Sequence, residues 1–519
     1  MKKFTTSILL LCLSTMLAAK DYYVATNGND DHTGTKEAPF ATLAKAQSVV
    51  QPGDTVYIRG GVYKPTNKDI MGWKNNLYHC VFLMDKSGES DERRICYFGY
   101  PGERPIFDLS EVHPESGRIS VFFVNGSWLH FRNFDVTGTQ VIPAVGNTQS
   151  ECFSNRGGSH NIYENLAIHD GKGIGFYLTE GSDNLVLNCD AYNNYDDVSG
   201  ADNEGAGNGG NVDGFGGHPA EGSTGNVFRG CRAWWNSDDG FDLIHSGEAV
   251  TIEHCWAFYN GYKPGTKQSA GDGNGIKAGG YGMNENSKIP AGDIPMHTVT
   301  NCIAYGNKAA GFYANHHLGG LRFCNNTAYN NRWNYNMLNR QSREVAEDVP
   351  GYGHILRNNI SFQGREADIA NINEAVCEII NNSFLPTPLN VTEVDFVSID
   401  PTELTATRDA DGNLPAISFL VPASNSALAS ASMGYTFDVP DEEPVISGDD
   451  WLMEAAICID GDSASIQGPD AKEYNRFYIN GESVSIRNGI VNLNGYTGTL
   501  HLKATSPTKG GIIKLTITR

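Results

Sequence analysis

The chain has 519 residues, with 38 Lys and Arg against 60 Asp and Glu, which gives a formal net charge of −22. A nucleic acid would need a strong local basic patch, so this charge argues against nucleic acid as a partner and suits a protein that holds divalent cations. The length allows several domains or one large repetitive domain, and no apolar run reaches the length of a membrane span.

Residues 1–19 have the features of a secretion signal. Two lysines precede the apolar run 8–13, and two alanines end the segment before Lys20. We therefore predict an exported protein that is secreted, periplasmic or held at the cell surface. The cysteines that follow show neither a CxxC pair nor a Cys/His zinc spacing.

Residues 38–50 predict a short amphipathic helix, because its apolar side chains recur at Phe40, Leu43, Ala46 and Val50. Residues 52–54 end this helix, and a strand is expected at 55–58. Such a helix would cover the open end of a solenoid built by the chain that follows.

Internal repeats then dominate the sequence. A segment of the type Asn-Cys-x-Ala-aromatic-x-Asn recurs with small variations between residues 164 and 331. The second residue of each copy serves as a marker, and consecutive markers are 24, 42, 24, 47 and 24 residues apart. The markers are Asn165, Cys189, Cys231, Cys255, Cys302 and Asn326.

A unit of 24 residues with occasional insertions is too short for a propeller blade and lacks the Leu pattern of a horseshoe. It fits one coil of a right-handed parallel β-helix, whose neighbouring coils lie roughly 4.8 Å apart. The predicted fold class is therefore all-β. The marker cysteines are expected as buried thiols in a ladder, although stacked coils also bring Cα atoms near disulfide distance.

The repeat fades after about residue 390, and 440–444 resembles a linker. We expect a β-helix domain at 20–436 and a small antiparallel β domain at 437–519, which is either a binding or sorting module or a plain appendage. The motif at 409–413 suggests a calcium loop but lacks the later Glu, so a turn is expected. Alternating segments of the small domain are 476–479, 498–502 and 511–517.

Three segments, 214–216, 240–242 and 275–277, share a glycine followed by Phe or Ile. If they are equivalent positions in successive coils, two rows of stacked residues result. Insertions at 195–211 and 261–273 precede two of the segments, and long loops on one side of a solenoid usually build a binding face. The first row is Asp213, Asp239 and Asn274, and the second is Gly216, Asp242 and Lys277.

With Asp238 beside Asp239, this arrangement gathers four carboxylates, which would repel one another strongly unless a cation lay among them. Hard oxygen ligands without Cys favour Ca²⁺, which takes about 6–8 oxygens. Each Asp-Gly pair, taken alone, would predict only a turn. The register between the segments favours the metal site, with Asp213, Asp238, Asp239 and Asp242 as candidate ligands.

Lys277 lies in the uncharged run 273–280, one coil beyond Asp242. A lone lysine is usually a solvated surface charge. Here burial and a nearby cation would both lower its pKa from about 10.4, as a basic catalyst requires.

These segments resemble the family 9 polysaccharide lyases, which are right-handed β-helix enzymes similar to pectate lyases. The resemblance covers roughly residues 20–435 and rests on the coil repeats and four motifs: GTKEAPFATL at 34–43, NVDGFG at 211–216, NSDDGFD at 236–242 and GNGIKAGG at 273–280. Matched motif by motif, the family's calcium ligands fall on Asp213, Asp238, Asp239 and Asp242, and its Brønsted base falls on Lys277.

The resemblance implies a secreted, calcium-dependent lyase that cleaves galacturonate in pectin, a plant polysaccharide, by β-elimination and leaves a 4,5-unsaturated sugar. We expect a monomer. Candidate sugar contacts are Asn274, Tyr313, His316 and Arg340, with Asn336 further along the Lys277 row.

Two other functions stay open at this stage. A pectin hydrolase would use clustered Asp residues as acid and base, with water as the nucleophile and no metal. A non-catalytic, carbohydrate-binding β-helix would bind the polymer without cutting it. The sequence separates neither polygalacturonate from the rhamnogalacturonan backbone nor endo from exo cleavage.

Overall fold

The computed structural model describes residues 19–142, 149–198, 209–280, 294–436, 456–467, 471–480, 482–486, 489–506 and 511–518. The predicted signal, apart from its last residue, and the predicted linker at 440–444 lie outside these residues, as does the domain boundary expected at 437. No described helix is long and apolar enough to cross a membrane.

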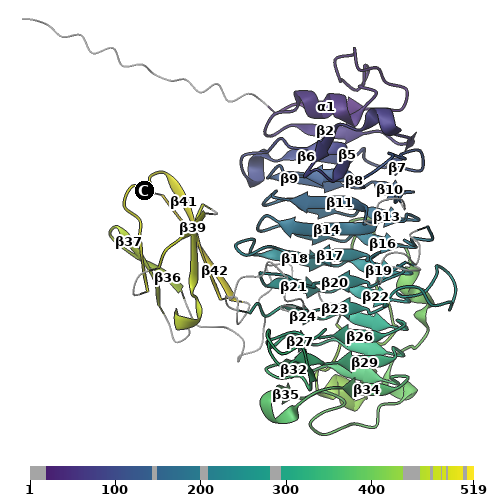
Figure 1. The fold of residues 1–519 in the computed structure, drawn as a ribbon, viewed down its shortest axis with the longest axis vertical. Helices are drawn as coiled ribbons and strands as arrows, with labels where there is room; N and C mark the ends of the chain where they lie inside the picture. Colours follow the sequence, from purple (N-terminus) through teal and green to yellow (C-terminus); the bar gives the residue numbers. More distant parts are fainter. Residues whose placement is uncertain are drawn as a thin grey trace, which may run out of the picture.

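Three stacks of short parallel strands form the solenoid that fills the right of Figure 1. Sheet A contains β1 (Asp21–Val24), β2 (Thr55–Ile58), β6 (Ile95–Gly99), β9 (Leu129–Arg132), β12 (Ile162–Glu164), β15 (Leu185–Leu187), β18 (Asn226–Arg229), β21 (Val250–Glu253), β24 (Thr298–Thr300), β27 (Arg322–Cys324), β32 (Ile355–Arg357) and β35 (Glu378–Ile380). Sheet B contains β3 (Val62–Tyr63), β7 (Ile106–Asp108), β10 (Asp135–Thr137), β13 (Ala167–His169), β16 (Asp190–Tyr192), β19 (Arg232–Trp234), β22 (Trp256–Phe258), β25 (Ile303–Tyr305), β28 (Thr327–Tyr329) and β33 (Ile360–Phe362).

Sheet C faces the viewer in Figure 1 and carries the candidate site. Its strands follow one another in chain order, and all pair in parallel except the antiparallel hairpin β4–β5 at its edge. They are β4 (Gly72–Lys74), β5 (Tyr78–Met84), β8 (Arg118–Val124), β11 (Glu151–Arg156), β14 (Ile174–Glu180), β17 (Phe215–Gly217), β20 (Phe241–Asp242), β23 (Ile276–Lys277), β26 (Ala310–Tyr313), β29 (Trp333–Asn336) and β34 (Ala367–Ala370). The parallel β-helix predicted from the repeat is confirmed.

Ladders of identical residues fill the interior. The side-chain amide of the last Asn of a repeat donates a hydrogen bond to the side-chain oxygen of the equivalent Asn in the next coil. Asn194 donates to Asn236 at 2.9 Å, and Asn260 donates to Asn307 at 3.0 Å. Inward phenylalanines of sheet C stack, with the Phe215 and Phe241 rings 5.0 Å apart. The marker cysteines Cys189, Cys231, Cys255 and Cys302 are free and buried, as expected for a ladder of thiols.

The N-terminal end of the solenoid is covered by α1 (Leu43–Val49), which confirms the predicted capping helix. Thr42 caps it by accepting a hydrogen bond from the Lys45 backbone N–H at 3.1 Å. The helix is shorter than the expected 38–50, because Phe40 forms a parallel β-bridge with Val24. The remaining short elements are η1 (Asn67–Asp69), η2 (Asp91–Arg93), β30 (Asn339–Arg340), β31 (Asp348–Val349), η4 (Glu374–Val376), η5 (Glu393–Asp395), η6 (Pro401–Thr405), α2 (Ala427–Ser430) and η7 (Ala471–Glu473).

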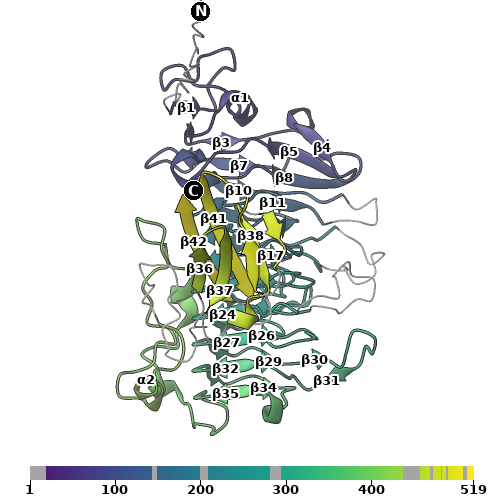
Figure 2. The same ribbon diagram turned by 90° about the vertical axis from the view of Figure 1, so that its left-hand side faces the viewer.

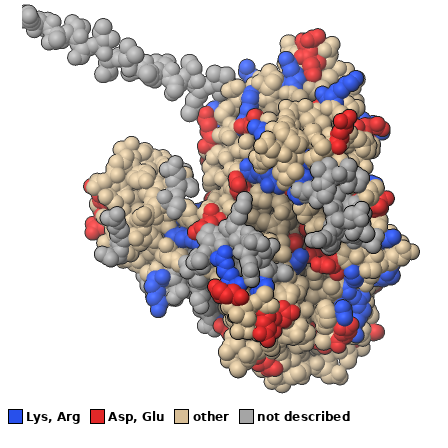
Figure 3. Space-filling view, viewed as in Figure 1, with Lys and Arg blue, Asp and Glu red and all other residues tan. Residues whose placement is uncertain are grey.

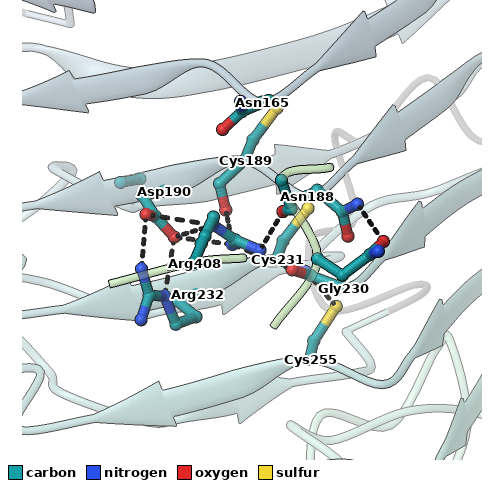
Figure 4. Close-up of polar contacts among 12 residues, drawn as sticks. Asn165, Asn188, Cys189, Asp190, Gly230, Cys231, Arg232, Cys255 and Arg408 are labelled. Atoms are coloured by element: carbon teal, nitrogen blue, oxygen red, sulfur yellow. Dashed lines mark hydrogen bonds and ion pairs between the residues drawn. The ribbon is translucent and has the colours of Figure 1, made fainter. Parts of the chain in front are cut away.

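Residues 391–436, here called the strap, pack against the outer face of sheet B through an apolar cluster that includes Phe396, Leu404 and Phe419. An ion-pair network joins the strap to the solenoid (Figure 4). Arg408 of the strap donates to Asp190 at 2.7 Å, and Arg232 donates to the same carboxylate at 2.7 and 2.9 Å. Asp409 accepts hydrogen bonds from the backbone of residues 411 and 413, so this motif forms the expected turn.

The C-terminal strands form a small antiparallel β domain with its own apolar core, as predicted. They are β36 (Ala456–Asp460), β37 (Ser463–Gln467), β38 (Arg476–Ile479), β39 (Glu482–Val484), β40 (Ile490–Asn492), β41 (Thr499–Ser506) and β42 (Gly511–Thr518). This domain lies beside the solenoid in Figure 1 and in front of it in Figure 2. Arg476 pairs with Glu248, and Lys503 pairs with Asp183 at 3.1 Å.

Candidate active site

The two rows expected from the repeat are present on sheet C. Gly216 pairs with Asp242, Asp242 with Lys277, and Lys277 with Tyr313 in parallel register. In the row before the strands, the Gly214 N–H donates to the carbonyl of Asp239 at 3.0 Å. Equivalent residues of successive coils stack because every strand pair of the sheet between β5 and β34 is parallel.

Three carboxylates meet at the centre of this arrangement. Asp213, Asp239 and Asp242 are buried, and each offers one oxygen within 4.8 Å of the others. The Lys277 Nζ lies 3.0 Å from an oxygen of Asp239 and 3.1 Å from an oxygen of Asp242. The structure therefore brings the proposed base into direct contact with two of the proposed ligands, and the third, Asp213, lies within 4.8 Å of those two.

Asp238 stands at the edge of the same cluster, where it holds two loops together. Its carboxylate accepts hydrogen bonds from the backbone N–H of Asn211 at 2.7 Å and of Asp272 at 2.6 Å. Both partners belong to the insertions that precede the site. Asp238 is 8% exposed and lines the cavity described below.

Burial is the main cause that raises the pKa values of the acidic residues. The pKa of Asp213 lies well above its ordinary value, and that of Asp239 rises to about 7, with the neighbouring carboxylates adding to burial. Burial alone would lower the pKa of Lys277, but Asp239 and Asp242 outweigh it and raise this pKa well above 10.5. The lowered lysine pKa expected from the sequence is therefore not found. That expectation assumed a cation among the carboxylates, whereas here the lysine itself balances them.

A cavity of about 200 Å³ opens beside the cluster. Glycines keep it open: a Cβ at Gly271 would lie 2.6 Å from an oxygen of Asp238, and one at Gly216 would lie 2.7 Å from His218 Nε2. The cavity is lined by Gln149, Ile174, Tyr177, Gly210, Asn211, Asp213, His218, Asp238, Asp242, Ile244, Gly271, Asp272 and Lys277.

The donor set fits a hard divalent cation. The trio offers only carboxylate oxygens, and the buried Asp239 Oδ2 makes no hydrogen bond of good geometry even though Lys277 lies next to it. Four carboxylates against one lysine leave an excess of negative charge that Ca²⁺ would neutralise, and its flexible coordination tolerates such a set. On the face that Figure 3 shows, acidic and basic side chains are interspersed.

The candidate sugar contacts lie in different places. Asn274 is buried, donates to Asp239 Oδ1 at 2.9 Å and accepts from the Ala310 N–H at 3.1 Å, so it supports Asp239. Tyr313 follows Lys277 in the row, and its hydroxyl lies 3.4 Å from His316 Nδ1. His316 and Arg340 lie further toward the C-terminal coils. None of these four lines the cavity.

The cavity instead contains residues that the motifs did not indicate, among them Tyr177, His218 and Asp272. Tyr177 pairs with Gly216 in the Lys277 row, so extending the row by one coil would have found it. His218 and Asp272 lie in non-repeating loops. The His218 Nδ1 lies 2.6 Å from the Ile244 carbonyl, which joins the segments after β17 and β20.

Two family models match the chain. The Pel9A-like right-handed β-helix region covers residues 22–367, and a rhamnogalacturonan lyase-like C-terminal region covers 373–514. Pectate lyase L of Dickeya dadantii is 34% identical over 433 residues, which is 81% of this chain and 89% of the relative. A pectate lyase of Emericella nidulans is 28% identical, and its alignment covers 80% of this chain and 95% of the relative.

Two solved structures are also similar. A rhamnogalacturonan lyase is 50% identical with a TM-score of 0.75, and the alignment covers 80% of this chain and 99% of that structure. Pectate lyase Pel9A is 32% identical with a TM-score of 0.61, covering 80% and 91%.

Proposed function

The chain belongs to the Pel9A-like right-handed β-helix family of polysaccharide lyases, and on that premise we propose that it cleaves galacturonate-containing pectic polymers by calcium-assisted β-elimination, with Lys277 as the base. The observation that carries the proposal is the contact of Lys277 with Asp239 and Asp242 beside a cavity on sheet C. We further propose that the protein acts after export, in line with the signal expected at its N-terminus.

The cation would be held by Asp213, Asp239 and Asp242, with Asp238 at the rim. When bound there, Ca²⁺ supplies Lewis acidity that draws charge from the uronate carboxylate and acidifies the neighbouring C5 proton. These carboxylates are the groups that raise the pKa of Lys277. Once their charge is matched by a cation, burial remains as the main influence on the lysine, and burial favours the neutral amine.

Neutral Lys277 then takes the C5 proton onto Nζ as general base. The C5–H electrons form the C4–C5 double bond, and the C4–O bond breaks with its electrons on the leaving oxygen, which gains a proton. One product is a 4,5-unsaturated uronate, and the other is a sugar with a new hydroxyl. Two observations support this role: Lys277 lines the cavity, and its backbone is fixed in β23.

The experiment is an absorbance assay for the unsaturated product with wild type, Lys277→Ala and Lys68→Ala. Lys68 is an exposed lysine of η1 and serves as the matched control. We expect Lys277→Ala to lose activity by about 100-fold or more, with the fold retained in saturating Ca²⁺. A chelator should abolish the activity of the wild type, and added Ca²⁺ should restore that activity.

Two outcomes would overturn the proposal. Substantial activity in Lys277→Ala would remove the lysine from the base role. Saturated products from a chelator-resistant enzyme would identify a hydrolase instead. Rhamnogalacturonan is the first polymer to assay and polygalacturonate the second, because identity is 50% to the rhamnogalacturonan lyase and 32% to Pel9A.

A further inference from the structure

The outer face of sheet C carries a second polar cluster on the N-terminal side of the cavity. It lies on β4, β5, β8 and β11, whereas the acidic cluster belongs to β20 and β23 and to the segments before β17 and β20. The inner face of these N-terminal strands is apolar, with the Phe122 and Phe153 rings stacked 4.5 Å apart in the core. Trp73, Tyr78, Arg118 and Arg156 are here called the N-terminal track.

The track is continuous with the cavity through Arg156. Its guanidinium lies 5.5 Å from the centre of the Tyr177 ring, which lines the cavity, and 4.4 Å from that of Tyr78. Arg156 also donates to the buried Glu151 at 2.6 Å and to the Tyr78 hydroxyl at 2.6 Å. The positive charge of Arg156 is therefore matched by Glu151.

Arg118 adds a second positive charge that no described carboxylate matches. Its Nη1 lies 3.4 Å from the Tyr78 hydroxyl, and no ion pair involves it within the described residues. Its buried Nε has no hydrogen-bond partner there. The cluster thus holds two guanidinium groups and one carboxylate, a local positive excess in a chain whose net charge is −22.

Trp73 lies beside this arginine. It is 45% exposed, and it is the one aromatic residue among the exposed large hydrophobic side chains of the described residues. Its ring packs over Gly117, the residue before Arg118, so closely that a Cβ there would lie 2.6 Å from the indole. The centre of the His79 ring is 4.4 Å from that of the Trp73 ring. The indole is therefore held in place while part of it stays open to solvent.

An open, rigid aromatic ring beside an unmatched guanidinium suits an acidic sugar. The apolar face of a pyranose ring packs on an aromatic surface, and a planar guanidinium binds a carboxylate through two hydrogen bonds. We propose that the N-terminal track is a remote subsite for a second uronate of the polysaccharide, with Arg118 binding its carboxylate and Trp73 packing against a sugar ring. This inference rests on the proposed function.

The distance between the N-terminal track and Lys277 determines which substrates can bind at both places. β8 and β23 are separated by five strand steps in the sheet order, which at about 4.8 Å each gives about 24 Å. A polymer lying along sheet C reaches both sites, whereas a disaccharide or trisaccharide at Lys277 does not. The subsite therefore raises affinity for long chains and leaves the chemical step unchanged.

The test compares Arg118→Gln and Trp73→Ala with wild type on the polymer and on the shortest oligomer that is cleaved. We expect the KM for polymer to rise roughly tenfold in each variant, with kcat unchanged and with no effect on the short oligomer. Arg132→Gln is the matched control, because Arg132 is a partly exposed arginine of β9 on sheet A. An equal change on both substrates, or none on the polymer, would overturn the proposal.

A binding assay separates this proposal from the proposed function. In native gels that contain polygalacturonate, the inactive Lys277→Ala variant should be retarded, and Lys277→Ala with Arg118→Gln should migrate faster. If the wild type releases no unsaturated product and Arg118→Gln still abolishes retardation in the Lys277→Ala background, the lyase chemistry is rejected and the subsite is kept. Equal retardation of the two variants would reject the subsite whatever the chemistry.

Discussion

The solenoid buries two acidic sites of opposite character on different faces of adjacent coils. Asp190 on β16 lies between Arg232 and Arg408, which donate hydrogen bonds to both of its oxygens. Burial would raise its pKa, but the two arginines hold that pKa at about 2. The acidic cluster on sheet C faces one lysine with four carboxylates, and burial raises the pKa values of Asp213, Asp238 and Asp239.

The difference separates a structural site from the proposed catalytic site. At Asp190 positive charge exceeds negative charge, and the network fastens the strap to sheet B. At the acidic cluster negative charge remains in excess next to an open cavity, which costs stability in the protein alone. Buried groups with such strongly perturbed pKa values are typical of catalytic and metal sites, where a ligand restores the balance.

Asp239→Asn should show the largest effect. We expect kcat to fall about 100- to 1,000-fold because the cation site loses a charged ligand. In chelator, the same change should raise the free energy of unfolding by about 1 kcal/mol or more, since it removes a buried charge whose pKa is raised first by burial and then by the neighbouring carboxylates. Asp190→Asn is the matched control for activity and should retain kcat per folded molecule. A destabilised Asp239→Asn protein would break the comparison.

Asp190→Asn should show the reverse pattern. It leaves the charges of Arg232 and Arg408 without a carboxylate in a site where both arginine side chains are at most 7% exposed. Removing one partner of a buried ion pair costs about 3–5 kcal/mol, so urea unfolding should report a loss of that size. A loss well under 1 kcal/mol would show that the strap is held by its apolar contacts alone.

The pH dependence of stability in chelator should also differ between the two sites. Asp190 has a lowered pKa, so its contribution is present above the unfolded value of 3.8 and disappears as the pH falls toward about 2. Asp239 has a raised pKa of about 7, so between about pH 4 and 7 the native state binds more protons than the unfolded state. Stability therefore falls as the pH rises through that window. Lys277 stays protonated throughout and adds no slope.

Melting temperatures measured from about pH 3 to 8 would check this. Asp239→Asn should make the fall between about pH 4 and 7 shallower and leave the part that comes from Asp213 and Asp238, whereas Asp190→Asn should flatten the loss at the acid end. Saturating Ca²⁺ should also remove the fall in the wild type, because bound cation keeps the carboxylates ionised in the native state. A fall that persists with Ca²⁺ would place its origin outside the acidic cluster.

The two rows of the proposed site were predictable because they lie on stacked coils. The markers Cys231 and Cys255 differ by one coil of 24 residues, and parallel pairing places equivalent residues of successive coils in one line. Insertions change the spacing before the site, but the glycine followed by Phe or Ile marks equivalent positions, and the Gly216–Asp242–Lys277 register follows from those marks. The protonation of Lys277 did not follow, because it depends on whether a cation or the lysine balances the acids.

Other features could not be predicted from the sequence because no repeat relates the residues that form them. Arg408 and Asp190 are 218 residues apart, and their contact arises only when the strap folds back on sheet B. His218 and Asp272 enter the cavity from loops of irregular length. Trp73 lies on β4, the antiparallel hairpin strand at the edge of sheet C, outside the repeating coils.

Glu248 offers an intermediate case, in which one buried carboxylate meets one arginine. It is 1% exposed, pairs with Arg476 of the small β domain, and accepts the Gly222 N–H at 2.7 Å. Burial raises its pKa, and Arg476 opposes that rise. Arg476→Ala should lower the free energy of unfolding by about 1–3 kcal/mol, less than Asp190→Asn, because a single hydrogen-bonded charge is left unpaired.

Adding Glu248→Gln to Arg476→Ala distinguishes the causes of that loss. If the cost comes from an unpaired buried carboxylate, the double variant should regain about 1 kcal/mol or more, because the neutral amide has no charge to desolvate. If Arg476 acts only by holding the small domain in place, the double variant should unfold as readily as the single one. Recovery would extend the comparison to three sites that differ in positive charge per buried carboxylate. Asp190 has two arginines and is stabilising, Glu248 has one arginine and is neutral, and the acidic cluster shares one lysine among four carboxylates and bears the proposed function.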